Sequence, residues 1–281
     1  DETLPTNYLA DEVIDDNKVN ELLAKKYNET IVIAEDDSEI LAYLKDELST
    51  NFRVIAVNNG YDAVKAVMDD EVSLILSDVL MPALNGFQLC SNIKSNIATC
   101  HIPIVLLTAL SDDNQRIYGI AEGADEYIHK PFNMQYVRLK IIRIIEERKR
   151  LASTFAQKFG RLTRHEAANL PCVDDVFRDK LFNLIEAQHS DSNFKIELMS
   201  DMLGMSRILL YRKITSIFGM SPSDLLRNYR LQKAVQLLTD QRRNVSEVAY
   251  IVGFSSPAYF AKCFKSVYNM TPTEYMYRTR E

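Results

Sequence analysis

The sequence predicts an α/β domain followed by an all-helical domain, on the basis of three observations. Five short apolar runs between residues 30 and 130 alternate with stretches of helical apolar spacing. Such alternation calls for a parallel sheet with helices on both faces. After residue 176 only helical spacing remains. A shift of 50 residues then aligns two parts of this tail, so the helical domain contains an internal repeat.

The composition is that of an ordinary globular protein. Of 281 residues, 47% are hydrophobic and 26% are charged, which suits about two domains with real cores. No apolar run reaches the ~18 residues of a membrane span, and no signal-peptide pattern opens the sequence. The four cysteines form no C-x-x-C pair and the four histidines have no metal-ligand spacing, which disfavours disulfides and zinc.

The net charge changes sign along the chain. Residues 1–29 carry −5, residues 30–190 carry −6 and residues 191–281 carry +5. We therefore expect only the tail to contact a polyanion. The acidic residues 1–29 are interpreted as a linker or a frayed helix.

The predicted strands and helices follow in strict alternation. The strands are Ile31–Ala34, Phe52–Val57, Leu74–Asp78, Ile102–Leu107 and Glu126–His129. Helices are expected over Ile40–Leu48, around Ala63–Val67, over Phe87–Ile93 and Ser111–Gly123, and from about Asn133. A parallel sheet in the order 2-1-3-4-5 would bring the ends of four strands around one crevice. The polar residues just past those ends are Glu35, Asp36, Asp78, Thr108 and Lys130.

These residues form a coherent chemical set around Asp78. Crowded carboxylates repel one another unless a cation neutralises the site, and Mg²⁺ suits carboxylate and phosphate oxygens. A carboxylate that attacks phosphorus needs positioning and charge neutralisation rather than a base. We therefore expect Asp78 to accept a phosphoryl group, with Lys130 as the second positive charge and the Thr108 hydroxyl as a hydrogen-bond donor to it.

Residues 30–150 resemble the receiver domain of two-component response regulators, which has a flavodoxin-like fold. The resemblance is carried by Glu35-Asp36, by Asp78 in S-D-x-x-M-P, by Thr108 in L-T-A and by Lys130-Pro131-Phe132. The spacings agree too, with 30 residues from Asp78 to Thr108 and 22 from Thr108 to Lys130.

The resemblance implies roles for individual residues. A histidine kinase would phosphorylate Asp78, and Thr108 and Tyr127 would form a switch pair. The ligands of Mg²⁺ would be Glu35, Asp36, Asp78 and the backbone carbonyl of Leu80. Asp37, just beyond the acidic pair, is expected to be solvated.

A longer apolar pattern starts at Val137 and passes through Ile141, Ile144, Leu151 and Phe155 to Leu162. These residues recur at alternating intervals of four and three, as in the seam of a coiled coil, and Arg148 and Lys158 interrupt the pattern. One alternative is that the last receiver helix extends and pairs with a second copy. The other is a single amphipathic helix that ends near Arg150. Residues 151–174 are expected to form a helical connector.

The repeat in the tail predicts two helix-turn-helix motifs within residues 175–281. Gly204-Met205-Ser206 and Gly253 to Pro257 each combine a glycine turn with a serine N-cap. A long helix, about Pro222 to Leu238, joins the two motifs. In such motifs the second helix enters the major groove with its N-terminal residues at base edges.

The second helices are expected to begin at Ser206 and Ser256 and to have one buried and one DNA-facing side. The predicted buried residues are Leu209, Leu210, Ile214, Phe218, Tyr259, Phe260 and Phe264. The predicted DNA contacts are Arg207, Tyr211, Arg212, Ser256, Ala258, Lys262 and Lys265. Arginine suits guanine edges and lysine suits phosphates.

This tail resembles the AraC/XylS-type DNA-binding domain. The residues that carry the resemblance are G-M-S-R-I-L-L-Y-R-K, N-V-S-E-V-A-Y-I-V-G-F and F-K-S-V-Y-N-M-T-P-T-E-Y. Ser200 stands where alanine is usual, which leaves the helix prediction intact. A helical protein-interaction module is the alternative to DNA binding.

Together the two resemblances imply a phosphorylation-dependent transcriptional regulator rather than an enzyme. Its partners would be DNA, a histidine kinase and, once phosphorylated, a second copy; no small-molecule substrate and no membrane contact are expected. The alternatives are a phosphorelay intermediate and an aspartyl-phosphate phosphotransferase. Phosphotransferases that resemble the haloacid dehalogenases require a second carboxylate two residues after the nucleophile. In this chain that position is Leu80.

The domain order also resembles the C-terminal part of hybrid two-component sensors. In that case a histidine kinase anchored in the inner membrane would precede these residues, which would lie in the cytoplasm. A free-standing cytoplasmic response regulator is the other possibility.

Overall fold

The computed structural model describes residues 16–109, 123–159, 174–240 and 243–278. The chain forms two compact units. The first comprises the chain up to Ser91 together with Pro103–Ile145, and the second comprises Asn92–Ile102 together with Glu146 onwards. The second unit therefore includes a segment of the sequence that lies inside the predicted α/β domain.

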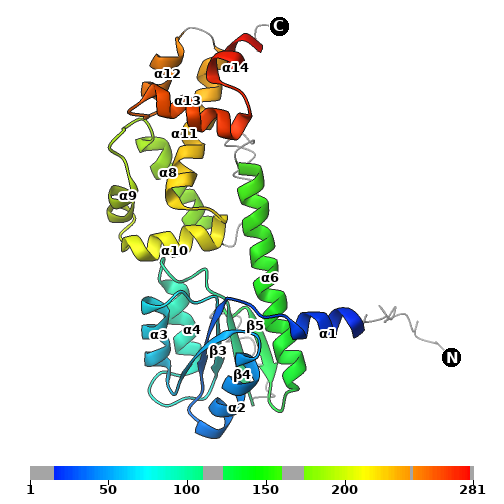
Figure 1. Cartoon of the computed structure of the whole chain (residues 1–281). Helices are drawn as coiled ribbons and strands as arrows, with labels where there is room; N and C mark the ends of the chain where they lie inside the picture. Colours follow the sequence, from blue (N-terminus) through cyan, green and yellow to red (C-terminus); the bar gives the residue numbers. More distant parts are fainter. Residues whose placement is uncertain (1–15, 110–122, 160–173, 241–242, 279–281) are drawn as a thin grey trace, which may run out of the picture. The chain divides into compact units, whose positions relative to one another are not determined.

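A five-stranded parallel sheet forms the centre of the first unit (Figure 1). Its order, β2-β1-β3-β4-β5, is the one predicted. All five residues of β1, β3 and β4 are buried, which explains why these runs are continuously apolar rather than alternating. The strands are β1 (Thr30–Ala34), β2 (Arg53–Val57), β3 (Leu74–Asp78), β4 (Ile104–Thr108) and β5 (Glu126–His129).

The sheet packs against helices through a core that includes Ile31, Leu74 and Val105. Leu44 and Leu48 contribute to this core from the helix after β1. The helix predicted over residues 111–123 lies outside the described residues, except for its last position. The described helices are α1 (Asp16–Ala24), α2 (Ser38–Ser49), α3 (Gly60–Asp69), α4 (Gly86–Ser95) and α6 (Met134–Phe159).

The described end of the acidic leader forms helix α1. Helix α1 carries Leu22 and Leu23, which pack against the core of the first unit. The Asn51 amide nitrogen donates to the carbonyl oxygens of Leu23 at 2.9 Å and Lys25 at 2.7 Å. These contacts attach residues 22–25 to the α/β unit.

Helix α6 extends past Arg150 to Phe159, which agrees with the alternative of an extended last receiver helix. Three of its seam positions are already buried within the chain, however. Val137 and Ile141 belong to the core of the first unit, and Phe155 belongs to the core of the second. These three seam positions are therefore not available to a second copy in this structure.

The second unit is helical throughout its described C-terminal part, and the predicted caps are present. Ser206 accepts a hydrogen bond from Leu209 N at 3.3 Å, and Ser256 accepts one from Tyr259 N at 3.4 Å. Ser200 is buried without disturbing its helix, because its hydroxyl donates to Glu197 O at 2.7 Å. The helices are α8 (Asp175–Gln188), α9 (Ile196–Met202), α10 (Arg207–Phe218), α11 (Pro222–Thr239), α12 (Val245–Ile251), α13 (Pro257–Tyr268) and α14 (Pro272–Arg278).

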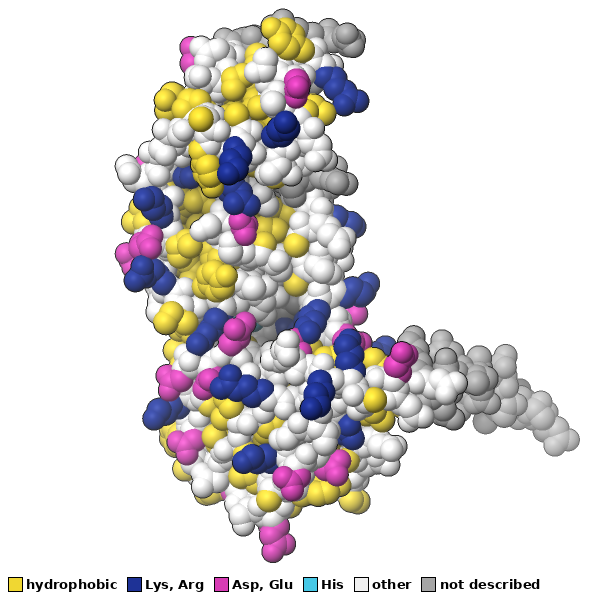
Figure 2. Space-filling model, viewed as in Figure 1, with side chains coloured by type: hydrophobic (Ala, Val, Ile, Leu, Met, Phe, Trp, Pro, Cys, Tyr) yellow, Lys and Arg dark blue, Asp and Glu magenta, His cyan; other side chains and the backbone are white. Residues whose placement is uncertain are grey.

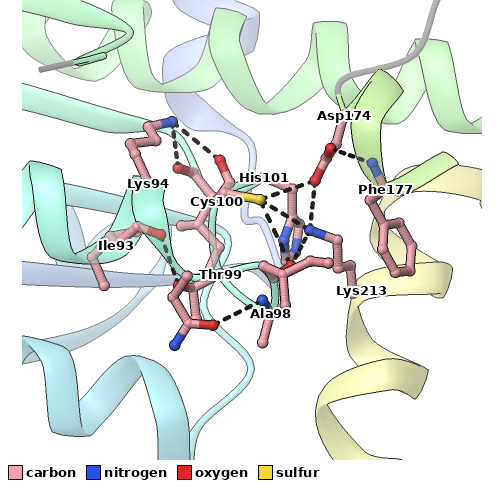
Figure 3. A network of polar contacts seen from close by, with 12 residues as sticks. Ile93, Lys94, Ala98, Thr99, Cys100, His101, Asp174, Phe177 and Lys213 are labelled. Atoms are coloured by element: carbon pink, nitrogen blue, oxygen red, sulfur yellow. Dashed lines mark hydrogen bonds and ion pairs between the residues drawn. The ribbon is translucent and has the colours of Figure 1, made fainter. Parts of the chain in front are cut away.

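A buried ion pair stabilises the second unit (Figure 3). Lys213 of α10 is fully buried, and its Nζ lies 2.6 Å from Asp174 Oδ2 and 3.2 Å from Cys100 Sγ. The ammonium also donates to the carbonyl oxygen of Ile97 and lies over the ring of Phe177. Residues 97–100 thus supply two of the groups that surround this charge.

The carboxylate of the pair remains ionised. Burial would raise the pKa of Asp174, but hydrogen bonds from Cys100, Lys213 and the Phe177 amide outweigh burial and lower the pKa. Burial and the nearby carboxylate raise the pKa of the Cys100 thiol, which therefore acts as a neutral donor. The result is a pair in which each charge has several partners, as buried ion pairs require.

The neighbouring His101 predicts a pH dependence of stability. Burial, with the charges of Lys213 and Arg148, holds the pKa of His101 well below 6.5. The unfolded chain therefore binds a proton that the folded chain does not. The free energy of unfolding should fall as the pH drops below about 6.5, by up to about 1.4 kcal/mol per pH unit.

Urea denaturation between pH 7.5 and 5.5 measures this effect when wild type and His101→Asn are compared. The wild type should lose more stability than the variant over this interval. Parallel curves for the two proteins would show that His101 does not stay neutral in the folded state.

Candidate functional site

Three carboxylates meet at the carboxyl ends of neighbouring strands. Glu35 and Asp36 directly follow β1, and Asp78 is the last residue of β3. Strands β1 and β3 pair in register, with Ala34 opposite Ser77. One oxygen from each of the three carboxylates lies within 4.8 Å of the others. The structure thus brings together the acidic residues predicted from the strand ends.

Lys130, just past β5, joins this cluster. Its Nζ lies 2.8 Å from Glu35 Oε2 and 3.0 Å from Asp78 Oδ2. One ammonium thus neutralises part of the charge of two acids that come from different strands. The side chain of Lys130 retains 19% exposure, so the cluster is open on the lysine side.

The electrostatics follow from unequal burial. Glu35 is 1% exposed and Asp78 is 8% exposed, whereas Asp36 is exposed. Burial raises the pKa of Glu35, the hydrogen bond from Lys130 lowers it in part, and the charge of Asp78 raises it further. Burial alone would lower the pKa of Lys130, but its hydrogen bonds to Glu35 and Asp78 outweigh burial and raise it. The lysine is therefore charged at neutral pH.

The backbone after β3 fixes the orientation of Asp78. Its Oδ1 accepts a hydrogen bond from Val79 N at 2.7 Å, which leaves Oδ2 for Lys130. The chain then returns so closely that Gly86 N donates to Val79 O at 2.9 Å. A Cβ on Gly86 would overlap the carbonyl oxygen of Asp78, so only glycine fits this start of α4.

The remaining predicted residues occupy the adjoining strands. Thr108 is buried at the end of β4, the strand next to β3. Tyr127 in β5 is partly buried and pairs with Leu106 of β4. Leu80 lies two residues past β3 with its side chain 59% exposed. Asp37 is exposed, as expected, and has a structural role in addition, since it caps α2 through Glu39 N and Ile40 N.

The donor set fits a hard divalent cation. All three candidate side-chain ligands are carboxylates, and they belong to the group that the described residues offer for a metal. Mg²⁺ takes one or two carboxylates and completes its shell with water and phosphate oxygens. Asp36, the exposed member, and Asp78 can both reach such an ion.

The second candidate surface consists of the exposed sides of α10 and α13. Arg207, Tyr211, Ala258, Lys262 and Lys265 are exposed, while Arg212 and Ser256 are partly buried. Figure 2 shows Lys and Arg side chains interspersed with hydrophobic ones on the helical unit. Each of the two helices begins with a serine cap, Ser206 in α10 and Ser256 in α13.

The prediction for the buried side of these helices is confirmed for most residues and wrong for one. Leu210, Ile214, Phe218, Phe260 and Phe264 are buried, and Leu209 is partly buried. Tyr259 was expected in the core but is 53% exposed. It occupies the first turn of α13, where a tyrosine can lean on Phe254, with ring centroids 6.2 Å apart, and still remain in solvent.

Two families match the chain. Residues 31–142 match the response regulator receiver domain, and residues 199–278 match a helix-turn-helix domain. Both matches fall on the regions singled out above, the first on the sheet with its acidic cluster and the second on the paired motifs. No described helix has the length and apolar character needed to cross a bilayer.

Individual proteins are similar to all or part of the chain. The chain is 37% identical, over its whole length, to 20% of histidine kinase P4 of Formosa agariphila. The transcriptional regulatory protein GltR of Pseudomonas aeruginosa is 38% identical to this chain over a match that covers 40% of this chain and 47% of GltR. The receiver domain of a signal transduction histidine kinase from Syntrophus aciditrophicus is 34% identical over 43% of this chain and 93% of its own, with a TM-score of 0.42. The chain thus spans a fifth of the first of these proteins and less than half of the second.

Proposed function

We propose that this chain, which matches a response regulator receiver domain and a helix-turn-helix domain, is a two-component response regulator, and that a phosphoryl group on Asp78 controls its binding to DNA. The observation that carries this proposal is the cluster of Glu35, Asp36, Asp78 and Lys130 at the strand ends, in one polypeptide with two helix-turn-helix motifs.

The chemistry at Asp78 is an in-line attack of Oδ2 on a phosphorus atom, from which the donor leaves with its bonding electrons. A histidine kinase is the proposed natural donor. Val79 N holds the other carboxylate oxygen and Lys130 neutralises the incoming phosphoryl group. The proposed ligands of Mg²⁺ are Glu35, Asp36, Asp78 and the carbonyl of Leu80. When bound, that ion supplies further charge neutralisation.

The readout begins at the neighbouring strands. Thr108 ends β4 beside β3 and can donate its hydroxyl to a phosphoryl oxygen, and Tyr127 on β5 then changes its packing. We propose that this change favours association of two copies, whose tails bind together to repeated sites in DNA. A few kcal/mol of bias between the two states is enough for such a switch.

In the tail, Arg207 and Arg212 are the proposed base contacts of α10, and Tyr211 lies beside them on the same helix. Lys262 and Lys265 of α13 would contact phosphates, with Ser256 and Ala258 at its N-terminal turn. The chain would act as a regulator rather than an enzyme, with reaction only at its own Asp78. We place residues 30–150 in the receiver, 151–174 in the connector and 175–281 in the DNA-binding domain, after an N-terminal linker at 1–29.

The location of the protein and its relation to a kinase follow from this proposal. Bacterial transcriptional regulators bind DNA in the cytoplasm, and this is the location proposed for the chain. The match of the whole chain to a fifth of a histidine kinase supports the hybrid alternative, in which the kinase and this chain belong to one polypeptide. A free-standing response regulator remains the alternative, because GltR carries the name of a transcriptional regulatory protein.

A gel shift on candidate promoter fragments tests the function. With a small phosphodonor and Mg²⁺, the wild type should bind at least several-fold more tightly than without donor, because paired tails bind with avidity. Arg207→Gln should lower the preference for specific sites while leaving the response to donor in place. An affinity that is the same with and without donor would contradict the proposed control, and failure to bind any duplex would contradict the proposed role of the tail.

A further inference from the structure

A pocket of about 420 Å³ lies in the helical unit where the two helix-turn-helix motifs approach each other. It is lined by the start of α9, by residues of α11 such as Leu226 and Arg230, and by the turn that leads from α12 into α13. Phe194, Leu226 and Phe254 are buried side chains of its lining. These buried apolar groups form part of the wall of the pocket.

The charged groups of this pocket are mostly cationic. Lys195, Arg227 and Arg230 line it, and the single acidic residue among the lining residues is Glu197. Glu197 is already engaged, since its Oε1 lies 3.0 Å from the guanidinium of Arg207. The pocket thus offers positive charge to a ligand.

Arg230 is held in place by the backbone. Its guanidinium donates to the carbonyl oxygens of His189 at 2.8 Å and Asp191 at 2.7 Å. Burial lowers the pKa of Arg230, an effect that the charge of Asp191 partly offsets. Gly253 allows this arrangement, because a Cβ there would overlap the carbonyl oxygen of His189 and meet Arg230 Nε at 2.9 Å. The positive charge is therefore fixed, with backbone carbonyls as its hydrogen-bond partners.

Arg227 provides a donor that lacks an acceptor. One edge of its guanidinium contacts Asp224 at 2.6 Å, but Nε is buried with no hydrogen-bond partner. A buried donor without an acceptor is unfavourable. A rotation of this side chain, which is 34% exposed, would let Nε donate to an anion in the pocket.

The position of the pocket identifies the anion. Ser255 and Tyr259, at the beginning of α13, line it, and Glu197 connects it to Arg207, the first residue of α10. Helix-turn-helix motifs place the N-terminal residues of these helices at base edges. The DNA backbone that runs from one groove to the next therefore passes this side of the helical unit.

We propose that this pocket binds a phosphate of the DNA backbone between the two grooves, with Arg227 and Lys195 as its contacts and Arg230 as a fixed positive charge behind them. This inference rests on the proposed function of the tail. The pocket acts as a third attachment point, between two sets of base contacts, and carries no sequence information itself.

The test measures the affinity of the full chain for labelled duplexes by fluorescence anisotropy over a series of salt concentrations. Arg227→Gln should weaken binding to all sequences by a similar factor. It should also reduce the slope of log affinity against log salt by about one, because one phosphate contact is lost. Lys180→Gln, an exposed site on α8 outside the pocket, removes the same charge and should leave the slope unchanged.

Two further variants separate the pocket from side effects. Arg227→Lys keeps the charge and should retain the slope, which guards against a folding defect in the Gln variant. Arg227→Gln combined with Asp224→Asn removes the released carboxylate and should still show the reduced slope.

A wild-type slope in Arg227→Gln, or an equal loss in Lys180→Gln, would overturn the proposed phosphate site while DNA binding itself stands. A wild type that binds no duplex would instead refute the function on which the site rests.

Discussion

Asp78→Asn should abolish phosphoryl uptake by the chain at every concentration of magnesium. An amide oxygen is a poor nucleophile for phosphorus, and no other carboxylate occupies the same position. Asp78 is held by Val79 N on one oxygen and by Lys130 on the other, at the end of a fully buried strand. Uptake is measured with a radiolabelled small phosphodonor. The increase in DNA affinity that the phosphodonor causes in the wild type should be absent in this variant.

Asp36→Asn is the matched control, since it makes the same chemical change in the same cluster. Asp36 is exposed, and the two ion pairs of Lys130 in this cluster involve Glu35 and Asp78 rather than Asp36. It should lower uptake by weakening the metal site, and higher magnesium should restore part of the loss. Equal uptake by wild type and Asp78→Asn would mean that another side chain accepts the phosphoryl group.

Asp174→Asn should destabilise the second unit by about 3–5 kcal/mol, because it leaves the buried charge of Lys213 without its carboxylate. The ammonium is 0% exposed and would retain the Ile97 carbonyl and the Cys100 thiol as neutral partners. The loss should appear in urea denaturation as an earlier transition of the helical unit. The chain has two units, so the transitions are followed separately.

Lys213→Met provides the comparison. Methionine fills much of the same volume without a charge, and Asp174 keeps its hydrogen bond from Phe177 N at 2.8 Å. The loss should therefore be clearly smaller than in Asp174→Asn. If the two variants lost the same stability, the ion pair would contribute through its packing rather than through its charges.

The sequence was sufficient for those features that depend on local pattern. Continuous apolar runs such as Ile31–Ala34 identify strands buried on both faces, and parallel strands bring their ends to one edge, where Glu35 and Asp78 meet. The caps at Ser206 and Ser256 likewise follow from their own neighbours in sequence. These features need no knowledge of distant contacts.

Other features depend on contacts that no local pattern encodes. Residues 92–102 belong to the helical unit, although they comprise the end of α4 and the segment that leads from it to β4 of the α/β fold. Lys213 looks like one more basic residue of α10, yet it is fully buried because Asp174, Cys100 and the Ile97 carbonyl surround it. Tyr259 fits the apolar spacing but lies at a helix start, where the core is already filled by Phe254 and Phe260.

The pocket between the motifs is a feature of the same kind. Its cations come from the start of α9 and the middle of α11, which are more than thirty residues apart in the sequence. Only the fold places Lys195 and Arg227 around one volume. The spacing within each motif predicted the helices that we propose to contact bases, but it gave no sign of a site between them.

The most direct test of the central claim is to locate the phosphoryl group by mass spectrometry of peptides from the full chain, after incubation with phosphodonor with and without Mg²⁺. The structure predicts a single acid-labile adduct on the peptide that contains Asp78, formed only with the metal. An adduct on another residue, or no adduct under these conditions, would contradict the account.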